Sequence, residues 1–128
     1  MLRVMHFDHQ VYFSERYRTE LAEYFQSVQD VNYHDYMITH SDSFESNQRD
    51  IELLLPSKDV FIVHTGIDDQ KRIFDYHSLF PDLKIALVTA VDLDSYKREE
   101  ERKDNIFLFS YTRMDQIKQF VLDQRSKK

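Results

Sequence analysis

The stretch "KDVFIVHTG", residues 58–66, decides the fold class of this chain. Its central residues, 60–63, are all β-branched or aromatic, and they are followed by His64 and then by Gly66, the only glycine of the sequence. A short, continuously apolar run is typical of a strand covered on both faces, as in a parallel sheet. The sequence therefore predicts a buried strand that ends on a histidine.

Four further segments have the composition of strands, and five have helical spacing of apolar residues. The other strands are expected at residues 3–7, 31–39, 85–88 and 106–109, of which the polar, tyrosine-rich 31–39 suits a sheet edge. The helices are expected at residues 14–28, 43–56, 68–81, 92–105 and 112–124, with Ser14 and Thr112 as the N-caps of the first and last. Strand and helix thus alternate five times. This pattern predicts an α/β/α fold whose five-stranded parallel sheet has the common order 2-1-3-4-5.

The composition indicates one globular domain with few kinds of site. The 128 residues suit a domain over residues 1–124, with 125–128 as a tail or the start of a linker, and 41% hydrophobic content provides a core. The absence of cysteine excludes disulfides, cysteine-ligated metals and thiol nucleophiles. A single glycine leaves no glycine-rich phosphate loop and no nucleophile elbow.

Charge and hydropathy set expectations for location and partners. No apolar stretch approaches the roughly 20 residues that cross a bilayer, and the first residues do not form a signal peptide. We therefore expect a cytoplasmic protein without membrane contact. The net charge is −6, and Lys and Arg are dense only in the last residues, 125–128, so we expect no nucleic-acid binding by this domain.

The predicted topology also predicts where a site would lie. In open parallel sheets, ligands bind beyond the carboxyl ends of the strands, where the strand order reverses. The residues that end the predicted strands at this edge are Asp8, His9, His64, Thr89 and Ser110.

These strand ends, taken in order, resemble the response-regulator receiver domain. In that family the first strand ends in two acidic residues that hold magnesium, and Asp8 and His9 occupy these positions in "RVMHFDH". The third strand ends in the phosphoacceptor aspartate, and His64 occupies that position in "DVFIVH". The fourth ends in Thr or Ser and a small residue, which Thr89 and Ala90 match in "IALVTA".

The last motif of the resemblance is the most altered. Where the family has a lysine after the fifth strand, "IFLFSYTRMDQI" has Ser110 or Tyr111, and Phe107 is near the position of the family's switch aromatic. The resemblance covers the whole chain in order and length and implies a flavodoxin-like fold, although the segment between the first and third strands is longer than usual.

The departures imply that the phosphotransfer chemistry is lost. Aspartyl phosphorylation needs a carboxylate nucleophile, a divalent cation and a positive charge on the phosphoryl group. The chain has His64 at the acceptor, one acid instead of two and no lysine, and magnesium prefers oxygen ligands. The resemblance therefore implies a pseudo-receiver of two-component signal transduction, a regulatory protein with no catalytic residue and no cofactor.

Three interpretations of His64 stay open. It can fill space and bond to Asp8 or a backbone carbonyl, or it can join Asp8 and His9 in a ligand or transition-metal site. It can also act as a proton-linked switch, because Asp8 favours its charged form and burial opposes it. An enzyme, such as a hydrolase or transferase that uses Asp8 with His64 as base, is a further alternative, although no nucleophile, base and orienting group are visible together.

The resemblance also implies a contact surface. In receivers, the face of the fourth helix, fifth strand and fifth helix binds a partner or a second copy. The residues expected there are Tyr96, Phe107, Phe109 and Tyr111. The fifth strand, "IFLF", is very apolar for a sheet edge, which invites either pairing or coverage by the adjacent helices. Residues 97–104 are most simply a solvated helix with ion pairs.

The other histidines are expected to be structural. His6 lies inside the first strand, where we expect a hydrogen-bonded core residue, and His77 should be half-buried on the third helix. His34 and His40 should flank the second strand and face solvent.

Overall fold

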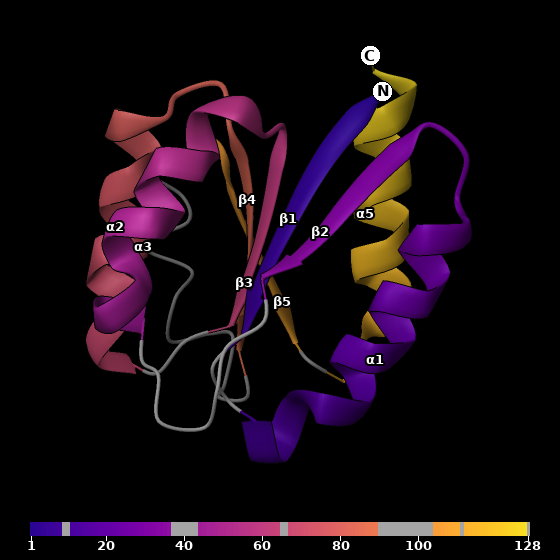
Figure 1. The fold of residues 1–128 in the computed structure, drawn as a ribbon, viewed down its shortest axis with the longest axis horizontal. Helices are drawn as coiled ribbons and strands as arrows, with labels where there is room; N and C mark the ends of the chain where they lie inside the picture. Colours follow the sequence, from indigo (N-terminus) through magenta and orange to yellow (C-terminus); the bar gives the residue numbers. More distant parts are fainter. Residues whose placement is uncertain (9–10, 37–43, 65–66, 90–103, 111, 128) are drawn as a thin grey trace.

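The computed structural model describes the chain except residues 9–10, 37–43, 65–66, 90–103, 111 and 128 (Figure 1). Five parallel strands form one sheet in the order β2-β1-β3-β4-β5. The strands are β1 (Leu2–Asp8), β2 (Val31–Tyr36), β3 (Val60–His64), β4 (Lys84–Thr89) and β5 (Ile106–Ser110). The predicted fold class and strand order are therefore confirmed, including the position of β2 at an edge.

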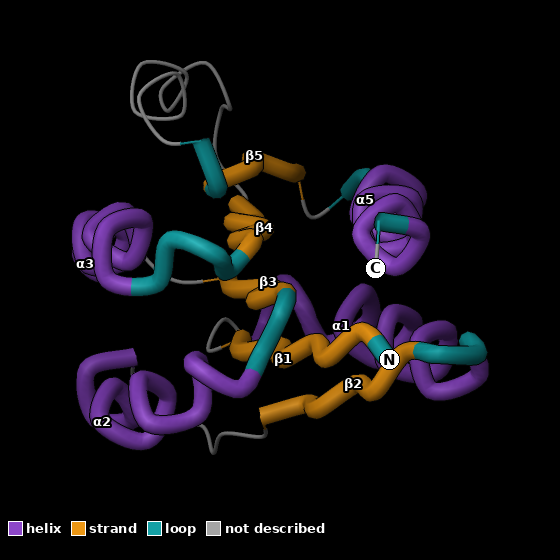
Figure 2. The backbone as a smooth tube through the Cα atoms, turned by 90° about the horizontal axis from the view of Figure 1, so that it is seen from above, coloured by secondary structure: helices purple, strands orange, loops and turns teal. Residues whose placement is uncertain are grey.

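Helices cover both faces of the sheet. They are α1 (Val11–Ser27), α2 (Phe44–Leu54), the 3-10 turn η1 (Leu55–Ser57), α3 (Ile67–Leu79) and α5 (Met114–Ser126). Helices α1 and α5 lie on one face, and α2 and α3 lie on the other (Figures 1 and 2). The helix expected over residues 92–105 falls almost wholly outside the described residues.

The alternation of side chains along the strands divides the core into two layers. In β3 every residue is buried, with Phe61 and Val63 in the layer under α2 and α3, and Val60 and Ile62 in the layer under α1 and α5. This two-sided burial is why the central strands appear in the sequence as continuous apolar runs. The two layers draw their other sheet residues mainly from β1 and β4: Met5, Phe7, Ile85 and Leu87 in the first, and Leu2, Val4, Ala86 and Val88 in the second.

The helix ends differ from the predicted ones. Helix α1 already begins at Val11, so Ser14 lies inside it and is not its N-cap. The N-cap of α5 is Arg113, which makes no side-chain capping bond. Thr112, the predicted cap, lies one residue earlier, and its hydroxyl pairs with the Ser110 hydroxyl at 2.8 Å. An N-cap contributes only about 1 kcal/mol, so a helix can begin at a residue without a capping side chain.

The end of α5 is also later than expected. The helix continues through Arg125 and Ser126, which the sequence suggested as a tail. The Arg125 guanidinium donates from Nη1 to the carbonyl of Gln29 at 3.1 Å, in the turn before β2. In the same turn Asp30 has φ 65°, a left-handed conformation that aspartate tolerates, and its carbonyl accepts a bond from the Leu2 amide at 2.9 Å.

Apart from His9 and His64 at the predicted site, the chain has four histidines, of which the structure describes three. One of these three differs from expectation. His6 is fully buried and its Nδ1 lies 2.5 Å from the Tyr33 hydroxyl, which confirms a core residue with a side-chain hydrogen bond. His77 is half-buried, as predicted. His34 does not flank β2 but lies within it, next to Met5 in register, and is half-buried for that reason. His40 lies outside the described residues.

A buried asparagine fixes the start of β5. Asn105 is 2% exposed, and its Nδ2 donates to the carbonyls of Phe80 at 3.1 Å and Leu83 at 2.9 Å. Its Oδ1 lies 2.7 Å from Nδ1 of His77. One side chain thereby joins α3, the turn that follows it and the residue that precedes β5.

Candidate functional site

The strand register aligns the carboxyl ends of four strands. Asp8 of β1 pairs with His64 of β3, His64 pairs with Val88 of β4, and Thr89 pairs with Ser110 of β5. The main-chain positions that the sequence singled out therefore lie side by side along one edge of the sheet. In Figure 1 this edge is at the end of the molecule away from the labelled termini.

Side chains along each strand alternate between the two faces of the sheet, and this alternation also assigns the residues at the carboxyl edge to one face or the other. His64 continues the series of Val60 and Ile62, so its position belongs to the face under α1 and α5. Thr89 follows Leu87 by two residues, and Ser110 follows Leu108, so their positions belong to the face under α2 and α3. The edge therefore presents His64 to one layer and the two hydroxyl residues to the other.

Burial limits what the described side chains can reach. His64 and Thr89 are each 2% exposed, while Ser110 is half-buried. The Ser110 hydroxyl is engaged locally, with Thr112 Oγ1 at 2.8 Å and with the Thr112 amide, which donates to it at 3.3 Å. A short hydroxyl held in this way cannot supply the mobile positive charge that a phosphoryl group requires.

The interpretation of His64 as part of a metal or ligand site stays a prediction. His9 and the side chain of Asp8 lie outside the described part of the chain. Among the side chains that are described, no group of three His, Cys, Asp or Glu residues is placed to hold a metal ion. The carboxylate and imidazole chemistry of Asp8, His9 and His64 would suit a transition metal more than magnesium.

The aromatic residues expected at a contact surface are partly covered. The Phe107 ring lies 4.8 Å from that of Phe120 in α5, measured between centroids, and the Phe109 ring lies 5.3 Å from it. Both phenylalanines of β5 are half-buried in the layer under α5. Tyr96 and Tyr111 lie outside the described residues.

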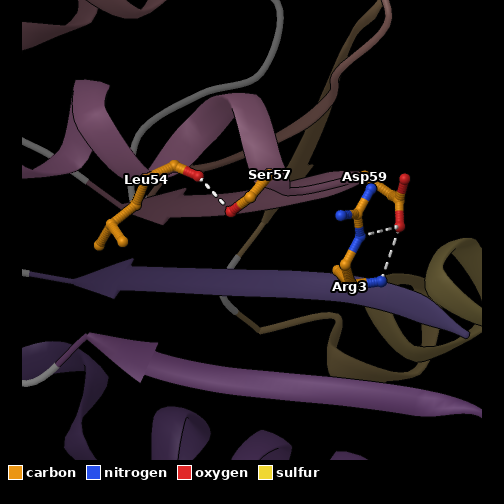
Figure 3. A network of polar contacts seen from close by, with 4 residues as sticks. All are labelled: Arg3, Leu54, Ser57 and Asp59. Atoms are coloured by element: carbon orange, nitrogen blue, oxygen red, sulfur yellow. Dashed lines mark hydrogen bonds and ion pairs between the residues drawn. The ribbon is translucent and has the colours of Figure 1, made fainter.

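Sequence reasoning missed a charged group at the opposite, amino edge of the sheet. Arg3 binds Asp59 through its amide nitrogen at 2.8 Å and its Nε at 3.4 Å (Figure 3). Burial and the nearby positive charge of Arg3 lower the pKa of Lys58. Burial and Lys58 lower the pKa of His34, while Asp35 opposes this change. These residues come from β1, from β2 and from the two residues before β3, so only the strand order could have brought them together.

We expect His34 to titrate below the ordinary histidine pKa of 6.5. Its folded pKa is lowered, so the unfolded chain binds this proton more tightly than the folded chain. The corresponding stability is therefore complete above pH 6.5 and is lost as the pH falls from 6.5 through the folded pKa. An NMR titration of the His34 ring protons measures this pKa directly.

Two substitutions test the cause of the His34 shift. Lys58→Gln should raise the pKa of His34, because it removes a positive neighbour, and Asp35→Asn should lower it further. Lys127→Gln removes an exposed lysine at the end of α5 and is the matched control. An unchanged pKa in Lys58→Gln would show that burial alone lowers it.

Comparisons with known proteins add no relative. No family model, no curated protein and no solved structure matches the chain. The class that the structure defines is an α/β fold of the flavodoxin-like type with parallel strand order 2-1-3-4-5. Within the described residues, none of the helices has the length and apolar character needed to cross a membrane.

Proposed function

We propose that this chain is a receiver-like regulatory domain that acts through protein contacts and is not phosphorylated on aspartate. The observation that supports it most is His64, a buried histidine at the carboxyl end of the central strand, where the resemblance to receivers expects the phosphoacceptor. An imidazole cannot form the acyl phosphate of an aspartate. The 2% exposure of His64 supports the same proposal, because a phosphodonor must reach the accepting atom.

The surroundings of His64 support the same proposal. The register partner on β1 is Asp8, a single acid, and the residue at the lysine position, Ser110, has its hydroxyl bonded to Thr112. Magnesium is held mainly by carboxylates and phosphate oxygens, and phosphoryl transfer depends on positive charge around the transferring group. The positions that match the receiver motifs thus lack the second acid and the lysine on which that reaction depends.

The proposal places the protein in cytoplasmic signal transduction of the two-component type, as a non-enzymatic module. Its partner would be another protein or a second copy, bound on the face of β5 and α5. Of the residues proposed for that face, Phe107 and Phe109 are half-buried, so their outer surfaces could contribute only part of a contact.

The test is an amide NMR titration with beryllofluoride and magnesium, which together mimic a phosphorylated aspartate. We expect the amide signals of the four strand ends to stay in place. We also expect an unchanged intact mass after incubation with acetyl phosphate. Magnesium and fluoride without beryllium provide the matched control. Saturable shifts confined to Asp8, His64 and Thr89 would refute the proposal.

A further inference from the structure

A recess lies at the amino edge of the sheet, at the end of β3 opposite to His64. It has a volume of about 190 Å³ and lies between Leu55, Pro56 and Lys58 on the η1 side and residues 79–83 on the other. Figure 1 shows η1 and the turn from α3 to β4 at the same end of the molecule, the end where β3 and β4 begin. All residues that line this recess are described.

Leucines contribute to the apolar part of the recess, which is lined by polar groups as well. Leu55 and Leu83 are 1% and 3% exposed, whereas Leu79 on the rim is 62% exposed. Leu53, in the last turn of α2, is 71% exposed but does not line the recess. Leu79 is thus the exposed leucine that lines the recess, above the buried side chains of Leu55 and Leu83.

One positive charge stands at the wall of this recess. Lys58 is half-buried and belongs to the η1 side, beside Arg3, whose guanidinium is already paired with Asp59 (Figure 3). The opposite segment contributes the exposed carboxylate of Asp82. A bound molecule therefore meets a cation on one side and an anion on the other.

We propose that this recess is a docking site for a segment of a partner protein that carries one large apolar side chain with a carboxylate next to it. An engineered cavity of about 150 Å³ accepts one benzene molecule, so the recess matches a single phenylalanine or leucine side chain. The adjacent carboxylate complements Lys58 and is repelled by Asp82, which fixes the direction of the segment.

This site is independent of the receiver-like edge. It involves neither His64 nor the face of β5 and α5, and it would remain if the chain were phosphorylated after all. Its charge also differs from that of the whole chain, whose net charge is −6. An acidic partner segment would be repelled by most of the surface, so the local cation must provide the attraction.

The test uses the dipeptide Phe-Asp, acetylated and amidated so that the side-chain carboxylate is its only charge. We expect saturable amide NMR shifts at Lys58, Phe80 and Leu83, with a Kd on the order of 1 mM, because only one side chain is buried. The dipeptide Phe-Asn should bind about 5-fold more weakly, and Ala-Asp should lose most of the affinity.

The matched protein variants are Lys58→Gln, Leu79→Ser and the control Lys127→Gln. Lys58→Gln should weaken Phe-Asp about 5-fold and leave Phe-Asn unchanged, while Leu79→Ser should weaken both. Both side chains are at least partly exposed, so the variants should fold as the parent does. Absence of saturable shifts at these amides, or equal binding by the parent and Lys58→Gln, would overturn the proposal.

Discussion

Replacement of Asn105 by alanine is expected to lower the free energy of unfolding by about 3 kcal/mol, a large share of the stability of a domain of this size. Asn105 is 2% exposed and makes three side-chain hydrogen bonds. The substitution leaves the Phe80 and Leu83 carbonyls and the His77 ring without these bonds. It also removes the restraint between α3 and the start of β5.

The geometry of this side chain determines the tautomer of His77. Both protons of the Asn105 amide nitrogen are used by the carbonyls of Phe80 and Leu83, so its Oδ1 must accept. The ring of His77 therefore donates from Nδ1 across the 2.7 Å contact. Asn105→Asp replaces the donor by an acceptor that faces two carbonyls, and it should destabilise at least as much as alanine.

Urea denaturation followed by circular dichroism measures both variants. Asp104→Ala changes the exposed neighbour of Asn105 and is expected to stay within about 0.5 kcal/mol of the parent. A loss of less than about 1 kcal/mol in Asn105→Ala would show that water replaces the amide and that the asparagine does not hold β5 in place.

The role of Asn105 shows what the sequence could and could not predict. Strands such as β3 are recognisable because burial on both faces requires a continuous apolar run. Asn105 ends a charged segment, and nothing local distinguishes it from a solvated turn residue. Its partners Phe80 and Leu83 are more than 20 residues earlier, and only the assembled fold brings them within hydrogen-bonding distance.

For the candidate site, the main-chain positions were predictable from the sequence, but the side-chain contacts were not. Once the strand ends and their order are known, Asp8, His64, Thr89 and Ser110 must lie along one edge. The local bond of Ser110 to Thr112 depends on torsion angles after β5, and the sequence instead suggested a helix cap for Thr112. The recess beside Lys58 was not foreseen, because it lies between two segments that each look like ordinary turns.

The second large loss of stability is expected when the Phe120 side chain of α5, which packs on β5, is removed. Phe120→Ala is expected to cost about 4 kcal/mol, because Phe120 is 9% exposed and contacts the rings of both Phe107 and Phe109. The conservative variant Phe120→Leu should cost less than half as much, since it refills most of the space. Urea denaturation of the two variants gives the comparison.

The same variants distinguish coverage of β5 from a need for a partner. If α5 covers Phe107 and Phe109 in the free protein, Phe120→Ala should expose them and promote self-association, which sedimentation velocity would detect. Phe120→Leu should sediment as the parent does. If the parent itself associates through this face, its stability should rise with protein concentration, and Phe120→Ala should reduce association together with stability. The sign of the change in association therefore decides whether the apolar strand "IFLF" is covered by its own helix or kept for another molecule.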